Sequence, residues 1–122
     1  MTRERLELGK FGEVLAYQKI KRLGYRKIVR NYRCPLGEVD LIAEDGDTLV
    51  FIEIKTRRGR SPAYAKEAVN ARKKRQISKV ALYYMKANDC IGVRARFDVI
   101  AISLDREKVV TEIIRNAFDL SY

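Results

Sequence analysis

Apolar residues first recur along the chain at helical spacing. Within residues 5–23, Ala16, Tyr17 and Ile20 fall on one side of a helix, and Gly24 follows as a C-terminal stop. This segment therefore predicts a first helix, although its apolar face is imperfect.

Three strands are expected next. Residues 25–33 have basic residues interspersed among apolar ones, and a proline and a glycine then turn the chain into the run 38–44. The acidic turn 45–47 leads into a third apolar run, 48–56. Such short runs separated by turn residues are typical of adjacent strands.

The second half of the chain predicts one long helix and two more strands. A loop rich in arginine covers 57–63 and is expected to be mobile, the helix covers 64–88, and strands cover 94–104 and 108–114. The order indicates an α/β fold in which helices flank a sheet. Because there is no internal repeat or linker, residues 1–122 are expected to form one domain.

The charge of the chain favours a polyanionic partner. Lysine and arginine total 26 against 16 acidic residues, which gives a net charge of +10 and a pI near 9.8. Clustered positive charge gains free energy when it displaces the counterions of nucleic acid. No apolar stretch approaches the ~18 residues of a membrane span, so no membrane partner is expected.

The chain contains Cys34 and Cys90 but no histidine. The start of the sequence is charged rather than signal-like, so reduced thiols and a cytoplasmic location are expected. Two distant cysteines without histidine argue against zinc and against Ser-His or Cys-His catalysis. Hydrolytic chemistry would have to use carboxylates, lysines and a hard metal ion.

Three charged residues interrupt the apolar runs 38–44 and 48–56: Asp40, Glu53 and Lys55. Alternate residues of a strand share a face, so Glu53 and Lys55 point the same way. A two-residue hairpin loop would place Asp40 directly opposite Glu53, and a loop shifted by one residue would place it diagonally, still within reach of one ion.

Two facing carboxylates repel each other unless a divalent cation bridges them. All-oxygen ligands favour Mg²⁺ or Mn²⁺, and Lys55 could then hold a metal-bound water or stabilise a phosphorane-like transition state. The alternative is a salt-bridged strand face on which Lys55 neutralises Glu53 and Asp40 is solvated.

The long helix carries a second signal. Lys73 and Gln76 fall within its apolar stripe, and a polar residue on a core-facing side needs a partner. They could reach the metal site or a phosphate, or extend to solvent at the edge of the stripe. The stripe comprises Val69, Ile77, Val80, Tyr84 and Ala87. A neighbouring basic face could follow a phosphate backbone or simply be solvated; it comprises Arg72, Arg75, Lys79 and Lys86.

The acid in one strand followed by Glu-x-Lys in the next resembles the PD-(D/E)XK nuclease signature, although its leading proline is absent. Four segments also resemble the YraN-like family of endonuclease-like bacterial proteins: 8–16, 30–43, 49–57 and 96–102. The resemblance implies a restriction-endonuclease-like fold, a mixed central sheet between helices.

The resemblance extends to archaeal Holliday-junction resolvases, which place a glutamate of the first helix near the metal. Glu13 matches that position, although it could instead be a surface residue paired with Lys10. Gln76 matches a glutamine that some relatives carry in the helix after Glu-x-Lys. A homodimer is suggested by the same analogy.

These observations lead to one main hypothesis, a Mg²⁺- or Mn²⁺-dependent endonuclease acting on DNA, with preference for branched or other non-B structures. Asp40, Glu53 and the main-chain carbonyl of Ile54 would bind the metal, assisted by Glu13 through water. The residues expected to contact nucleic acid are Arg33, Arg57, Arg58, Arg60, Arg72, Lys73, Arg75 and Lys79.

The alternative to this hypothesis is a nucleic-acid-binding module with a non-catalytic nuclease-like fold. RNA cleavage is less favoured because no base-stacking motif of a known RNA-binding module is evident.

Overall fold

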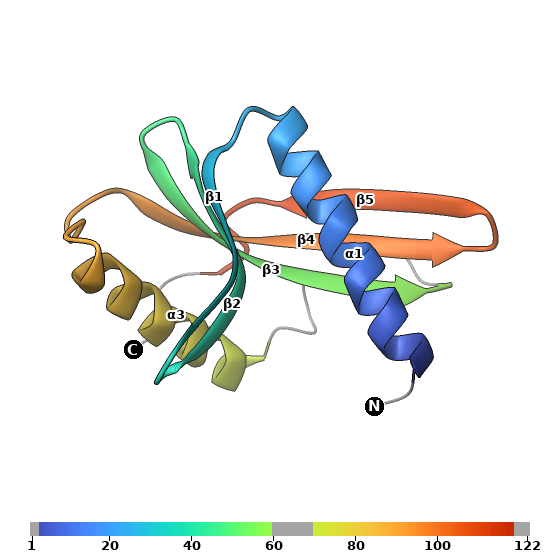
Figure 1. Cartoon of the computed structure of the whole chain (residues 1–122), viewed down its shortest axis with the longest axis horizontal. Helices are drawn as coiled ribbons and strands as arrows, with labels where there is room; N and C mark the ends of the chain where they lie inside the picture. Colours follow the sequence, from blue (N-terminus) through green and yellow to red (C-terminus); the bar gives the residue numbers. More distant parts are fainter. Residues whose placement is uncertain (1–2, 60–69, 119–122) are drawn as a thin grey trace.

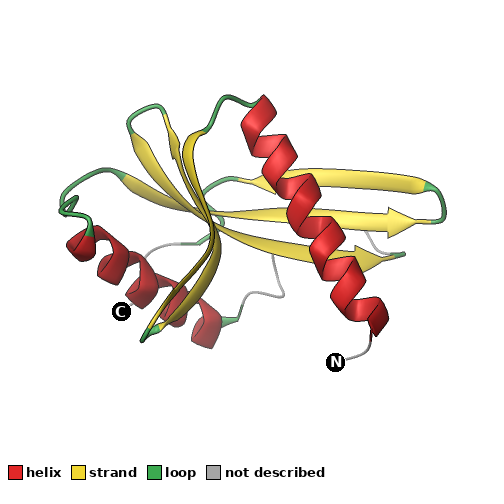
Figure 2. Cartoon of the chain, viewed as in Figure 1, coloured by secondary structure: helices red, strands yellow, loops and turns green. Residues whose placement is uncertain are grey.

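The computed structural model describes residues 3–59 and 70–118, in which five strands form one sheet with a helix on each face (Figures 1 and 2). The elements are α1 (Arg3–Arg22), β1 (Arg26–Cys34), β2 (Gly37–Asp45), β3 (Thr48–Arg58), α3 (Ala71–Ala87), β4 (Ala95–Asp105) and β5 (Lys108–Ile114).

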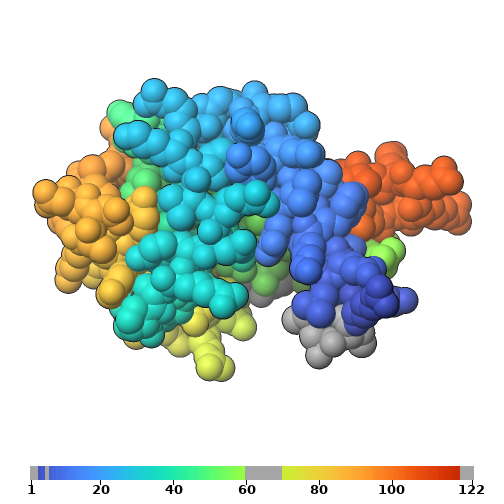
Figure 3. All heavy atoms as spheres, viewed as in Figure 1, coloured from blue at the N-terminus to red at the C-terminus, as the bar shows by residue number. Residues whose placement is uncertain are grey.

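The sheet is mixed, with the strand order β1-β2-β3-β4-β5. The pairs β1–β2, β2–β3 and β4–β5 are antiparallel, whereas β3 and β4 run parallel. A parallel pair needs a crossover connection, and α3 lies in the segment that joins β3 to β4. The β4–β5 hairpin projects beyond the rest of the molecule (Figure 3). This mixed sheet with flanking helices is consistent with the predicted restriction-endonuclease-like fold.

Two apolar layers hold the sheet between its helices. On one face, Ala16 and Ile20 of α1 pack with Ile52 of β3. On the other face, Ile77 and Val80 of α3 pack with aromatic and aliphatic residues of β2, β3 and β4. Because β3 is covered on both sides, its first six residues are all buried, and this explains their nearly continuous apolar run.

Most of the predicted elements are confirmed, and apart from the start of the long helix their boundaries differ by at most two residues. The exception is the basic loop predicted over 57–63: Arg57 and Arg58 belong to β3, because the strand continues to pair with β4 there. Gly59 follows the end of β3, and residues 60–69, which include the rest of that loop and the predicted start of the long helix, lie outside the described residues. The prediction of a helix through Asn70 is wrong: Asn70 has an extended backbone and caps the start of α3 with its side chain. Ala87 is exposed rather than part of the core stripe.

None of the helices described here has the length and apolar character needed to cross a membrane.

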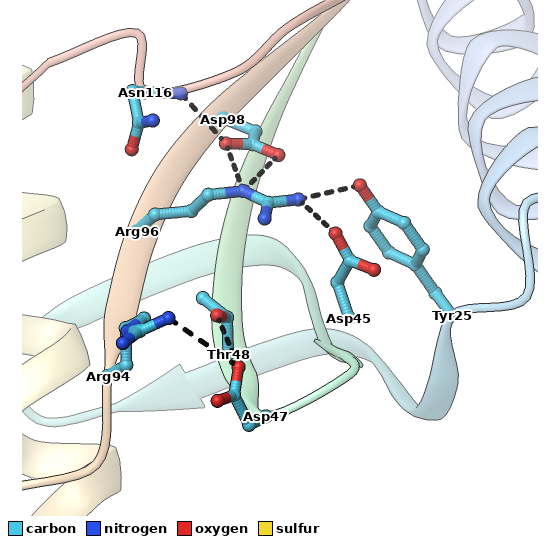
Figure 4. A network of polar contacts seen from close by, with 8 residues as sticks. All are labelled: Tyr25, Asp45, Asp47, Thr48, Arg94, Arg96, Asp98 and Asn116. Atoms are coloured by element: carbon cyan, nitrogen blue, oxygen red, sulfur yellow. Dashed lines mark hydrogen bonds and ion pairs between the residues drawn. The ribbon is translucent and has the colours of Figure 1, made fainter.

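A buried polar network joins distant segments at the end of the sheet near the β2–β3 turn (Figure 4). The guanidinium of Arg96 donates to both carboxylate oxygens of Asp98 at 3.1 Å, and to Tyr25 Oη and Asp45 Oδ2 at 2.8 Å. Asp98 is 1% exposed and also accepts a hydrogen bond from the backbone N–H of Asn116. Burial raises the pKa of Asp98, while the hydrogen bond from Asn116 and the charge of Arg96 oppose that effect.

Replacing Asp98 with alanine should lower the free energy of unfolding by about 3 kcal/mol, because the largely buried guanidinium of Arg96 loses one of its two carboxylate partners and the backbone N–H of Asn116 loses its acceptor. Urea denaturation would measure this loss. Asp47→Ala is the matched control, since the Asp47–Arg94 ion pair is long, at 3.9 Å, and both side chains are exposed. Equal losses in the two variants would contradict a stabilising role for the network.

Candidate metal centre

The register of the β2–β3 hairpin decides where the predicted acids lie. Asp45 pairs with Thr48 across a two-residue turn, and Leu41 pairs with Ile52. The same register, continued by one pair, places Asp40 opposite Glu53. The first of the two hairpin geometries expected from the sequence is therefore confirmed.

Asp40 lies just beyond the last ladder pair of the hairpin and is held against β3 by its side chain. Its Oδ2 atom accepts a hydrogen bond of 2.8 Å from the backbone N–H of Ile54. This hydrogen bond holds one oxygen of the Asp40 carboxylate beside Ile54, the residue that follows Glu53. The two acids thus come together through both strand pairing and a side-chain hydrogen bond.

Glu53 is 7% exposed, which is unusual for an ionisable side chain. Its Oε1 atom lies 4.0 Å from Lys55 Nζ and 3.9 Å from Lys73 Nζ. Burial raises the pKa of Glu53 to about 7; the charge of Asp40 adds to this effect, and the ammonium groups of Lys73 and Lys55 oppose it.

The second carboxylate oxygen of Glu53 lacks compensation. The carboxyl groups of Glu53 and Asp40 can share a hydrogen bond only while a proton is present, and that hydrogen bond also raises the pKa of Glu53. With both groups ionised, Oε2 of Glu53 is buried and has no hydrogen-bond partner among the described residues. An unpaired carboxylate oxygen beside a second carboxylate fits a hard divalent cation.

No third acidic or thiol side chain within 3–59 and 70–118 completes a compact ligand cluster around the pair. An ion held by Asp40 and Glu53 would therefore take its remaining ligands from main-chain carbonyls and water. This coordination suits Mg²⁺, which usually retains several waters and one or two carboxylates.

Beside the pair is a cleft of about 820 Å³ between the N-terminal half of α1 and the end of β3. The space-filling view shows the surface hollowed between α1 and the β1–β2 hairpin (Figure 3). Glu13 lines the same cleft as Asp40, whereas Glu53 is not among the lining residues. The lining residues are Glu4, Leu8, Gly9, Glu13, Asp40, Ile54, Lys55, Thr56, Arg57 and Arg58.

The helix that carries Glu13 is set close to β3 by a glycine. Gly12 is buried, and a Cβ atom at this position would overlap Thr56 Oγ1 and lie 3.1 Å from Thr56 Cβ. This contact was not predicted from the sequence, although glycine is often used where two backbones approach closely. The contact explains how Glu13, one residue later, lies over the cleft.

The remaining predicted catalytic residue, Gln76, lies against the turn of the β1–β2 hairpin. It is exposed, and its side chain packs on Gly37, where an added Cβ would be 2.9 Å from Gln76 Cγ. Gly37 has a φ of +141°, which a side chain would strain. Gln76 thus connects α3 to the start of the strand that carries Asp40.

The residues predicted to contact nucleic acid are spread over several elements. Arg33 is exposed and forms a 3.1 Å ion pair with Glu38. Arg57 and Arg58 line the cleft, and Lys73 contacts Glu53. On α3, the predicted residues Arg72, Arg75 and Lys79 are all exposed. Arg60 lies outside the described residues.

The raised pKa of Glu53 predicts a distinctive dependence of stability on pH in metal-free buffer. The folded protein binds this proton more tightly than the unfolded chain, whose value is near 4.5, so stability is lost as the pH rises from about 4.5 to above 7. The full shift corresponds to at most roughly 3 kcal/mol. Glu53→Gln removes this cost and should become progressively more stable than the native protein over that range.

Urea denaturation at a series of pH values, with EDTA present, would measure this difference. Glu38→Gln is the control, because Glu38 is exposed. If the stability of Glu53→Gln and that of the native protein changed with pH in the same way, ionisation of the buried Glu53 carboxylate would not be what destabilises the protein at higher pH.

Comparisons with known proteins assign the chain to a family. The model of the uncharacterised protein family UPF0102 matches residues 12–102. A UPF0102 protein of Syntrophus aciditrophicus is 43% identical over 119 residues, which cover 98% of this chain and 94% of the relative. A UPF0102 protein of Geobacter sulfurreducens is 50% identical over 116 residues, which cover 94% and 91%. In agreement with the predicted YraN-like family, this chain belongs to the UPF0102 family.

Proposed function

We propose that this protein is a metal-dependent endonuclease that hydrolyses phosphodiester bonds in DNA. The observation that carries the proposal is the buried Glu53 carboxylate, which has one unpartnered oxygen, a second acid opposite it and Lys55 beside it. This arrangement costs free energy in the absence of a cation, so folding alone does not account for it. It lies next to an open cleft that a substrate can enter.

The donor set assigns a role to each residue. Asp40 and Glu53 would hold Mg²⁺ or Mn²⁺ together with the main-chain carbonyl of Ile54, and Glu13 would act through water across the cleft. The bound ion supplies Lewis acidity toward a phosphoryl oxygen.

Lys55 acts on the reacting groups. Its ammonium group, which lines the cleft, orients the attacking water and stabilises negative charge as it develops on the phosphoryl oxygens. In hydrolysis, the water oxygen forms a new bond to phosphorus and the bond from phosphorus to one sugar oxygen breaks. The leaving oxygen gains a proton, and the water loses one.

The surface charge favours recognition of the backbone of DNA rather than of its bases. Arg57 and Arg58 line the cleft, and Arg33 lies on the β1–β2 hairpin. Arginines that contact phosphates position the nucleic acid but do not recognise its base sequence. We therefore infer selectivity for shape, with branched or otherwise non-B DNA as the preferred substrate. The resolvase-like analogy extends the proposal to a homodimer.

A binding module without catalysis is the second candidate function. It is favoured by one observation that is independent of the acid pair, the net charge of +10 on 122 residues. Such a protein would bind nucleic acid with a strong dependence on salt but would not require the carboxylates.

Nuclease assays with Mg²⁺ or Mn²⁺ on branched, duplex and single-stranded DNA, and on RNA, would test the proposal. Asp40→Ala and Lys55→Met should each lower the cleavage rate by about 100-fold or more, since each removes a group that acts at the reacting phosphate. Asp47→Ala, on an exposed turn of the same hairpin, is the control and should cleave normally.

Two results would decide against the proposal. Absence of cleavage on every substrate by folded protein would leave the binding module as the function. Cleavage that persists in Asp40→Ala would place the active site elsewhere. Titration calorimetry with Mn²⁺ complements the assay, because a carboxylate-dependent metal site should lose its heat signal in Asp40→Ala.

A further inference from the structure

Two ammonium groups converge on one oxygen of Glu53. Lys55 Nζ and Lys73 Nζ lie 4.0 and 3.9 Å from Oε1, and they come from different elements, β3 and α3. Without metal, the two lysines balance the two carboxylates, Glu53 and Asp40. With a divalent cation bound at the two acids, both ammonium charges would be in excess and would favour an anionic ligand.

The ammonium groups of both lysines keep hydrogen-bond donors that Glu53 does not occupy. Both distances exceed those of a hydrogen bond, and among the described residues neither ammonium group donates a hydrogen bond to another side chain or carbonyl. Their side chains are 30% and 31% exposed, so solvent and ligands can reach them. Each ammonium carries three donors, which remain available to an anion.

The position of Lys73 is fixed by the start of its helix. Asn70 caps α3, and its side-chain oxygen accepts a 2.9 Å hydrogen bond from the backbone N–H of Lys73. The side chain of Lys73 thus extends toward β3 from a defined point of the backbone. A lysine held in this way is better placed to bind one particular group than a lysine on a free loop.

The charge around Lys73 also indicates an anionic ligand. The first turn of α3 contains no acidic residue, and Arg72, Lys73, Lys74 and Arg75 follow one another there. Cations are unfavourable at the positive end of a helix dipole, so this concentration of charge opposes helix stability. By contrast, α1 contributes Glu4 and Glu13 to the cleft on the other side of the site.

We propose that Lys73 and Lys55 together bind the phosphates of the substrate backbone at the site, and that Lys73 holds the phosphate next to the one that is cleaved. The backbone would then leave the site along the basic first turn of α3 and away from the acidic side of α1. In the free protein, Glu53 occupies the contact that the phosphate takes in the complex. This inference rests on the proposed function, because it places a polynucleotide at the acid pair.

Binding of DNA without metal tests this inference apart from catalysis. The probe is a short fluorescein-labelled duplex with a single-stranded overhang, and its anisotropy is measured in EDTA at pH 8 over a range of salt concentrations. Lys73→Met should weaken binding roughly fivefold and lower the slope of log Kd against log salt by about one, the value for one lost phosphate contact. Lys73→Arg retains the charge and should bind within about twofold of the native protein.

A double-mutant cycle then tests the competition between Glu53 and the phosphate. Glu53→Gln should tighten metal-free binding roughly fivefold, because both lysines lose the carboxylate that competes for them. In the Lys73→Met background this gain should shrink at least about twofold, since one of the two released contacts is missing. Lys74→Met is the matched control: Lys74 is in the same turn, but its Nζ lies 5.9 Å from the ring centroid of Phe118, and the gain should persist there.

The outcomes separate this inference from the proposed function. A salt slope that Lys73→Met leaves unchanged, or a gain from Glu53→Gln that is equal in the Lys73→Met and Lys74→Met backgrounds, would overturn the role of Lys73. So would an absence of DNA binding by the folded native protein. A failure of cleavage would leave these binding results intact, and the proposed hydrolysis would fail alone. Thermal melting of each variant confirms that the comparison is made between folded proteins.

Discussion

The burial of Glu53 in the centre of the sheet is the constraint on which the rest of the site depends. β3 pairs with β2 on one side and with β4 on the other, and helices cover both of its faces. A carboxylate placed there loses most of its hydration, so its energy depends on the few charges within reach. The charge of Asp40 destabilises the ionised form of Glu53, and the charges of Lys73 and Lys55 stabilise it. With burial, this balance leaves the pKa of Glu53 at about 7.

The elements around β3 each supply one contact that keeps this environment in place. Asp40 accepts a hydrogen bond from the backbone of Ile54, which holds β2 at the point where its ladder ends. α3 approaches with Lys73, and Gln76 of the same helix packs on Gly37. At the other end of the hairpin, the network around Arg96 holds the turn against β4. The site is therefore supported from both ends of β2.

The sequence was sufficient to predict those features that depend on local periodicity. An even-numbered hairpin loop and the period of a strand predict Asp40 either directly opposite Glu53 or diagonal to it, and the observed register selects the direct pairing. Features that depend on distant partners were not predictable in the same way. Arg57 and Arg58 belong to a strand only because Ser103 and Leu104 pair with them. Likewise, the partners of Asp98 include Asn116, 18 residues away, and nothing in the spacing of these residues indicates their contact.

The close approach of Gly12 to Thr56 has a consequence for how the cleft can vary. The helix and the strand are separated there by less space than one methyl group requires. The size of the residue at position 12 therefore sets the distance between α1 and β3. Among chains with this architecture, a larger side chain at the same crossing would push the helix away from the strand, so the width of the cleft can change without any change to the acid pair.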